Sequence, residues 1–168
     1  MKWIVYIGFS LLAILGVIAG IGYALPKTHV ASRHMELRQP PEAVYALIAG
    51  PSTWRKDVKK YEPVQDSSGR TWTELDEYDN AVTYERVQAA PPRRLVTRIV
   101  SKLPYGGSWT YELTPTATGT DLRITENGEV YNPMFRFMGR FIFGNAATIE
   151  KYLNQTAQHF GETGKIEE

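Results

Sequence analysis

The sequence lacks cysteine altogether and has almost no excess of charge, and each absence excludes a class of protein. Without cysteine there can be no disulfide and no cysteine-based metal site. The 19 Lys and Arg residues and the 18 Asp and Glu residues give a formal net charge of +1 at pH 7. Because the two signs are interspersed along the chain, the sequence has no electrostatic footprint for nucleic acid.

The common motifs of catalytic and nucleotide-binding sites are also missing. There is no phosphate-binding loop, no Gly-x-Gly-x-x-Gly fingerprint, no His-Glu-x-x-His metal motif and no Gly-x-Ser-x-Gly elbow. The histidines are His29, His34 and His159, which do not have the spacing of metal ligands. His29 and His34 lie five residues apart on a predicted strand, so they should face opposite sides of it. We therefore expect no metal and no cofactor.

A long apolar segment is present at the N-terminus. Residues 3–25 contain no charged side chain, and a helix of this length reaches about 34 Å, enough to cross a hydrocarbon core of about 30 Å. Trp3 and Tyr23 lie near its ends, where aromatic belts are expected, and Pro26 ends the helix. The segment predicts a single-pass membrane helix.

Three properties of this segment stay open. We expect an uncleaved anchor over residues 1–26, and the alternative is a signal peptide whose removal leaves a mature chain beginning at Leu25. Basic residues are nearly balanced on its two sides, so the sequence does not give the side of the membrane. Gly16 and Gly20 match the small-x-x-x-small pattern of paired transmembrane helices, which offers a route to a dimer.

The rest of the chain predicts one compact domain, residues 27–161, and a short tail, residues 162–168. A first strand, residues 29–37, is followed by a helix that opens at Pro40-Pro41 and a second short helix that begins at Ser52. Six strands joined by short turns follow, and they cover residues 61–65, 71–78, 81–89, 94–101, 108–114 and 121–130.

The last predicted element is one long amphipathic helix over residues 132–160. Asn132 is a good N-cap and Pro133 suits the first helical position. No other long amphipathic helix lies in the domain, so the partner of its apolar stripe should be the sheet. Since a twisted antiparallel sheet can curl around one helix, we predict an α+β fold of order β-α-α-β6-α, with about seven strands wrapped on the C-terminal helix.

This order resembles the helix-grip fold of the START-like, Bet v 1-like superfamily, and in particular the bacterial SRPBCC or polyketide cyclase/dehydrase proteins. The resemblance spans residues 29–160, and its local marks are Pro40-Pro41-Glu42-Ala43-Val44, Trp54, Gly119-Thr120-x-Leu122-x-Ile124-Thr125-Glu126-x-Gly128 and Asn132-Pro133-x-Phe135-Arg136-Phe137. It implies a deep, mostly apolar cavity between sheet and helix that holds a hydrophobic small molecule or lipid. Some relatives are cyclases or dehydratases, and many only bind, carry or sense. The N-terminal anchor departs from the soluble members.

Glu126 is the most informative single residue. If Leu122 and Ile124 face the helix, alternation turns Glu126 the same way. Partial burial would then raise the pKa of its carboxyl group and suit it to proton transfer or to recognition of a ligand hydroxyl. The alternative is a carboxylate at the strand end that is solvated or paired with Arg136 or Arg140.

Aromatic and other apolar residues are the candidates for the cavity wall, and a plain packed core is the alternative reading. The candidates are Trp72, Tyr84, Trp109 and Tyr111 from the sheet and Phe135, Met138, Phe141 and Ile142 from the helix. The start of the helix carries more apolar bulk than one stripe needs, so a sheet, a ligand or a lipid surface should provide a second cover.

Two charged stretches are expected to be solvated. The acidic run of residues 73–77 predicts a strand edge in water. Four basic residues lie on and after the second short helix: Arg55, Lys56, Lys59 and Lys60. They could contact anionic headgroups, but the acidic residues between them favour ordinary solvation.

Three functional hypotheses follow from these features. The first is a membrane-tethered module that binds a hydrophobic or lipid-like small molecule between sheet and helix. The second is a cyclase- or dehydratase-type enzyme with Glu126 and Tyr84 as its acid–base pair. The third is an interaction module without a ligand, whose aromatic residues fill the core. The sequence does not identify the ligand.

Overall fold

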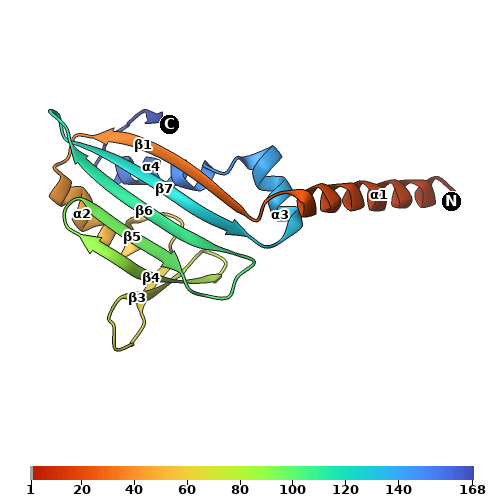
Figure 1. The fold of residues 1–168 in the computed structure, drawn as a ribbon, viewed down its shortest axis with the longest axis horizontal. Coiled ribbons are helices and arrows are strands. Elements are labelled where there is room, and N and C mark those ends of the chain that lie inside the picture. The colour runs from red at the N-terminus through yellow and green to blue at the C-terminus, as the bar shows by residue number, and fades with distance from the viewer. Residues whose placement is uncertain (1) are drawn as a thin grey trace.

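The computed structural model describes residues 2–168, in an α+β domain with one helix projecting from it (Figure 1). The strands are β1 Thr28–Leu37, β2 Lys60–Pro63, β3 Thr71–Leu75, β4 Ala81–Ala90, β5 Arg94–Ile99, β6 Tyr105–Pro115, β7 Thr120–Val130 and β8 Ile166–Glu167. The helices are α1 Lys2–Ala24, α2 Pro41–Ala49, α3 Pro133–Met138 and α4 Ala147–His159, with a 3-10 turn η1 Ser52–Trp54 and a π-helical turn η2 Gly139–Phe143.

All strands join one curved antiparallel sheet of order β2-β3-β4-β5-β6-β7-β1-β8. Strands β2 to β7 follow one another as a meander, as the short turns predict. The first strand, β1, lies next to the last strand of the meander. It pairs with β7 over its whole length, from Thr28 opposite Glu129 to Leu37 opposite Thr120. The eighth strand, β8, comes from the predicted tail and pairs with β1 at Met35.

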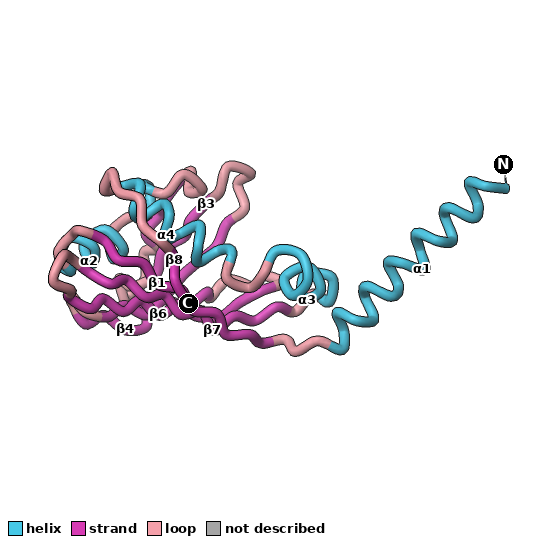
Figure 2. Tube along the Cα trace, turned by 90° about the horizontal axis from the view of Figure 1, so that it is seen from above, coloured by secondary structure: helices cyan, strands magenta, loops and turns pink. Residues whose placement is uncertain are grey.

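The core lies between the concave face of this sheet and α4, which Figure 2 shows across one face of the strands. Ile149 and Leu153 on the helix and Leu122 and Ile124 on β7 are fully buried. Val44 of α2 is buried in the same cluster. The predicted helix-grip fold is therefore confirmed.

The prediction of one unbroken helix over residues 132–160 is wrong. The Asn132 side chain caps α3 as expected, because its Oδ1 accepts hydrogen bonds from the backbone N–H groups of Met134 and Phe135. The chain then passes through η2 and leaves the helix at Gly144, whose φ of 77° suits glycine, before α4 begins. The spacing of apolar residues does not reveal a single residue with positive φ, so it predicted a continuous helix across Gly144.

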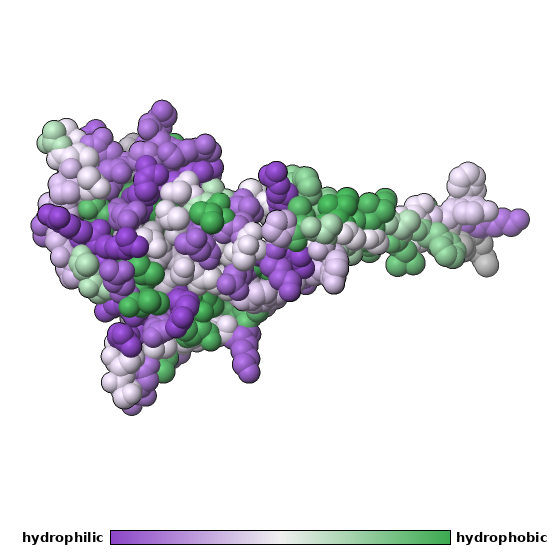
Figure 3. All heavy atoms as spheres, in the orientation of Figure 1, coloured by the Kyte–Doolittle hydropathy of each residue, from purple (hydrophilic) through white to green (hydrophobic). Residues whose placement is uncertain are grey.

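The projecting helix α1 is long and apolar enough to cross a membrane, and its apolar surface contrasts with the polar domain in Figure 3. Within the described residues, no atom lies within 4 Å of a Cβ built at Gly16 or Gly20. This face of α1 is therefore open, and a dimer through it stays a prediction.

The end of α1 packs tightly against α3, as Figures 1 and 2 both show. A Cβ at Gly22 would overlap the carbonyl oxygen of Pro133, so only glycine permits this approach. The buried Arg136 guanidinium donates hydrogen bonds to the carbonyl groups of Leu25, at 2.8 Å, and of Tyr23, at 3.4 Å. These are carbonyl groups that the end of a helix leaves without intrahelical partners. Arg136 thus joins α1 to the domain.

Gly22→Leu is expected to loosen this joint. Overpacking of this kind typically costs about 1–3 kcal/mol. The population in which α1 has separated from α3 should therefore increase by about 5-fold to 150-fold. Trypsin cleavage after Lys27, whose carbonyl group is bonded to the N–H of Val130, should accelerate by about that factor. Mass spectrometry of the digest measures the rate, and Gly8→Leu, at a position with free space around it, is the control. Equal rates for the two variants would contradict the described packing.

Candidate functional site

The helix α4 covers the concave face at one end only, and burial decreases along the strands toward the end nearest α1. On β7, Leu122 and Ile124 are 0% exposed, whereas the Glu126 side chain is 18% exposed. On β1, Met35 is 1% exposed and the His29 side chain is 19% exposed. We call this less covered region the open end of the concave face, and its central residues are His29, Trp109 and Glu126.

Glu126 points to the concave face, as alternation from Leu122 predicts. Trp109 lies directly opposite on β6, and its indole N–H donates a hydrogen bond to the carboxylate. The ion-pair partner of Glu126 in the described chain is neither Arg136 nor Arg140 but His29, whose Nε2 lies 3.8 Å from Oε1.

The electrostatics of this pair favour neutral groups. Burial raises the pKa of the Glu126 carboxyl group, and the Trp109 hydrogen bond only partly opposes this. Burial lowers the pKa of His29. A carboxyl group beside an imidazole offers hydrogen-bonding groups to a ligand hydroxyl or amide.

Sequence reasoning assigned His29 a structural or solvent role and therefore missed it. The position of His29 depends on Gly128, its partner on β7, because a Cβ there would overlap the imidazole ring. A glycine inside a strand often marks such a close approach, and it was the available signal. His34, five residues away, faces the other side of the strand, as predicted. Its Nδ1 lies 2.6 Å from Oδ1 of Asp121.

Glu126→Gln should change how stability depends on pH. A carboxyl group whose pKa is raised on folding contributes stability at low pH and loses it as pH rises through the folded value. The variant has no such loss, so its unfolding temperature should rise relative to the unmodified chain as the pH increases. Scanning calorimetry between about pH 4 and pH 9 measures the difference, with the exposed Glu77→Gln as control. A difference that stays constant with pH would contradict the buried placement of Glu126.

The predicted aromatic residues of the sheet do share the concave face. Trp72 stacks on Tyr84, with ring centroids 5.6 Å apart, and Trp109 lies 6.0 Å from Tyr111. Tyr152 of α4 covers Trp109 and Tyr111 at 5.7 and 5.6 Å. Burial raises the pKa of Tyr84 far above its usual range, so this hydroxyl group stays protonated and is a poor candidate for a general base.

The prediction that residues 73–77 form a solvated edge is wrong at Glu74. This residue is 8% exposed and accepts hydrogen bonds from Ser52 Oγ at 2.6 Å, Arg55 Nη1 at 3.1 Å and Trp72 Nε1 at 3.1 Å. Arg55 was expected in solvent or against headgroups, but it is largely buried between Glu74 and Asp57 and lies over the Tyr152 ring. Glu74 occupies a concave-face position of β3, and the η1 turn brings Arg55 to it.

The candidates on the helical segment lie away from α4. Phe135, Phe141 and Ile142 are each more than half exposed, and Met138 is partly buried. Phe141 contacts Phe137, with ring centroids 4.9 Å apart. These residues belong to α3 and η2, beside the end of α1, and so form an exposed apolar surface there.

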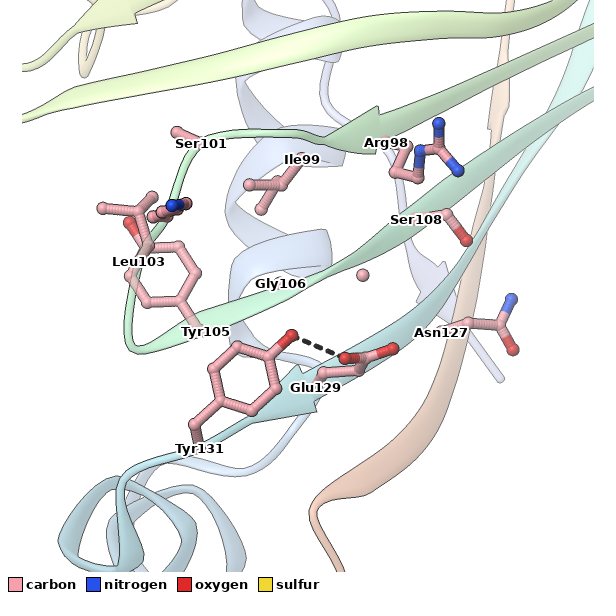
Figure 4. Close-up of a pocket in the computed structure, with 12 residues that line it drawn as sticks. Arg98, Ile99, Ser101, Leu103, Tyr105, Gly106, Ser108, Asn127, Glu129 and Tyr131 are labelled. Carbon is pink, nitrogen blue, oxygen red and sulfur yellow. Dashed lines mark hydrogen bonds between the residues drawn. The ribbon is translucent and has the colours of Figure 1, made fainter.

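Among the hollows in the described part of the chain, two are informative, and neither is lined by residues of α4. The larger, about 500 Å³, lies at the β5–β6 loop and extends onto the outer face of the sheet (Figure 4). Arg98, Ser108, Asn127 and Glu129 line it from positions that alternate with the concave-face residues, and the Tyr131 hydroxyl group donates to Glu129 at 2.6 Å. Its lining is polar, unlike the apolar cavity that the sequence predicts.

The smaller hollow, about 220 Å³, lies between the end of α1, the adjoining ends of β1 and β7, and the α3–η2 segment. His29, Phe135 and Arg136 are among its lining residues. It therefore adjoins the open end of the concave face and the joint with α1.

Comparison with known proteins matches residues 28–160 to the family model described as polyketide cyclase / dehydrase and lipid transport. A search of curated proteins gave no match. Solved structures do match. A conserved protein from Geobacillus kaustophilus is 15% identical, with a TM-score of 0.64 over 83% of this chain and 100% of its own.

Two further structures have informative descriptions. Norcoclaurine synthase from Thalictrum flavum is 10% identical, with a TM-score of 0.59 over 81% of this chain and 88% of its own. A START superfamily protein from Mycobacterium smegmatis is 13% identical, with a TM-score of 0.58 over 77% of this chain and 98% of its own. At these identities the similarity is one of fold.

Proposed function

Because the chain belongs to the polyketide cyclase/dehydrase and lipid transport family, we propose that it is a membrane-tethered module that binds a lipid-like apolar molecule. The site is the open end of the concave face. The observation that carries this proposal is the decrease in burial from Leu122 and Ile124 to Glu126, which gives the carboxyl group beside Trp109 partial access to solvent.

The tether is α1, which we propose crosses the membrane once. Three residues, 25–27, separate the end of α1 from the start of β1, so the domain lies against the bilayer surface. The joint between Arg136 and the last carbonyl groups of α1 favours one orientation of the domain. Both features support the proposal that the open end lies near lipid, from which an apolar ligand could enter.

The ligand follows from the chemistry of this surface. Trp109 and the exposed Phe135 offer apolar contact area. Glu126 and His29 offer a donor and an acceptor to a polar group of the ligand. A long-chain molecule with one hydroxyl or amide group meets both requirements.

Photo-crosslinking of the full-length chain in lipid nanodiscs tests this proposal. A diazirine-bearing fatty alcohol should label β6, β7 and α3, around Trp109 and Glu126, and Glu126→Gln should reduce this labelling. The exposed Glu77→Gln is the matched control. Labelling confined to α1 would contradict the proposed site.

An enzymatic role is the second candidate, and the Glu126–His29 pair favours it. A carboxyl group with a raised pKa beside a neutral imidazole can move a proton to or from a bound substrate. Here His29 takes the place of Tyr84 as the partner of Glu126. Chemical conversion of a bound molecule by the unmodified chain, abolished in Glu126→Gln, would support this role over binding alone.

A further inference from the structure

The smaller hollow, between α1 and α3, has an unusual distribution of charge. Its basic lining residues are Lys27, Arg136 and Arg140, and none of the described residues that line it is acidic. Leu25 and Phe135 supply apolar walls. A concentration of basic side chains in a lining without acidic residues is suited to an anion.

Arg136 is the deepest of these groups and has an unused donor. Its side chain is 8% exposed, and its hydrogen bonds run to the backbone carbonyl groups of Tyr23, Leu25 and Tyr131. No acceptor within the described chain reaches its buried Nε. A buried guanidinium group without a carboxylate partner adds a positive charge that no neighbouring acidic side chain of the described residues neutralises by an ion pair.

Exposed apolar side chains flank the same hollow. Phe141 and Ile142 of η2 are each 58% exposed, and Phe143 is 64% exposed. They adjoin Arg140 in the chain, and the preceding helix α3 packs against α1. If α1 crosses the membrane, this segment lies at the level of the headgroups, where such side chains contact acyl chains and basic side chains contact phosphate.

We propose that the hollow bounded by Lys27, Arg136 and Arg140 binds the phosphate headgroup of an anionic phospholipid from the bilayer that α1 enters. The acyl chains of this lipid run along α1, next to η2. The site shares His29 and Phe135 with the region of the proposed ligand site but depends on other charged groups. It rests on the proposed tether, because only a membrane-inserted chain presents it to lipid. Guanidinium groups suit phosphate because they bind it bidentately.

Native mass spectrometry of the full-length chain, released from nanodiscs with equal phosphatidylglycerol and phosphatidylcholine, tests this site. The unmodified chain should retain one phosphatidylglycerol molecule in preference to phosphatidylcholine. In the double variant Lys27→Gln/Arg140→Gln, the ratio of bound phosphatidylglycerol to bound phosphatidylcholine should fall about fivefold for each basic residue removed, or about 25-fold in total. Arg136 stays unchanged because it also holds α1 to α3.

The matched control is Arg38→Gln/Arg93→Gln, which removes the same charge from exposed positions at the opposite end of the sheet. It should leave the preference unchanged. Equal losses in the two double variants, or no loss in either, would overturn the site.

Inorganic phosphate tests a free anion as the alternative ligand. If phosphate stabilises the chain in phosphatidylcholine nanodiscs as much as phosphatidylglycerol does, the hollow binds a free anion instead. If the chain does not insert into the bilayer, both the proposed tether and this lipid site are wrong. If the chain inserts but shows no preference between the two lipids, only the lipid site is wrong.

Discussion

Glu74→Ala is expected to destabilise the domain by about 3–5 kcal/mol, because removing one partner of a buried ion pair leaves the other charge uncompensated. The variant deprives Ser52, Arg55 and Trp72 of a shared acceptor. Arg55 then keeps only Asp57 as its carboxylate partner. Burial alone would raise the pKa of Asp57, but the hydrogen bond and charge of Arg55 lower it to about 2, so this ionic cluster is coupled.

Urea unfolding of the full-length chain in nanodiscs, followed by tryptophan fluorescence, measures this loss. The control is Glu77→Ala, which removes an exposed carboxylate three residues away and should change stability by less than about 0.5 kcal/mol. A cost at Glu74 as small as that at Glu77 would show that residues 73–77 form a solvated edge after all.

Leu153→Ala is expected to cost about 2–5 kcal/mol, the usual range for a leucine truncated in a packed core. Leu153 is fully buried on α4, in the cluster that contains Leu122 and Ile124 of β7. Because α4 packs on β1 and β7 of the concave face, truncation of Leu153 leaves a cavity in that interface.

The same urea experiment tests this prediction, with Asn154→Ala as its control. Asn154 is the next residue on α4 and is exposed, so its truncation should have little effect on stability. A loss below about 1 kcal/mol at Leu153 would mean that the sheet does not hold α4 as described.

Most of the fold could be predicted from the sequence because it depends on local patterns. Alternation along residues 108–114 identified β6 and its buried side, and the turns identified the meander. The break at Gly144 could not be predicted, because apolar residues keep a helical spacing on both sides of it. The strand β8 escaped because two residues carry no periodic signal.

The site was predictable only where alternation determines it. The direction of Glu126 followed from Leu122 and Ile124, two and four residues earlier on the same strand. Its partner His29 lies on a strand almost a hundred residues away, and the pairing of β1 with β7 brings the two together. Arg55 and Glu74 meet in the same way, through the packing of η1 against the sheet, which no spacing in the sequence encodes.

Two structural features connect the fold to the proposed function. Because α4 begins only after Gly144, Glu126 and His29 stay partly exposed at the end of the concave face nearest α1. The joint at Gly22 and Arg136 holds that part of the domain beside the apolar helix α1. The break at Gly144 separates α4 from the α3–η2 segment, and α3 packs against α1.

Mass spectrometry of the molecules that remain bound to the full-length chain after purification in mild detergent tests the central claim most directly. The account predicts one apolar molecule with a hydroxyl or amide group per chain, retained by Glu77→Gln and depleted in the double variant Trp109→Ala/Glu126→Gln. The absence of any such molecule from the unmodified chain, or its equal retention by the double variant, would contradict the account.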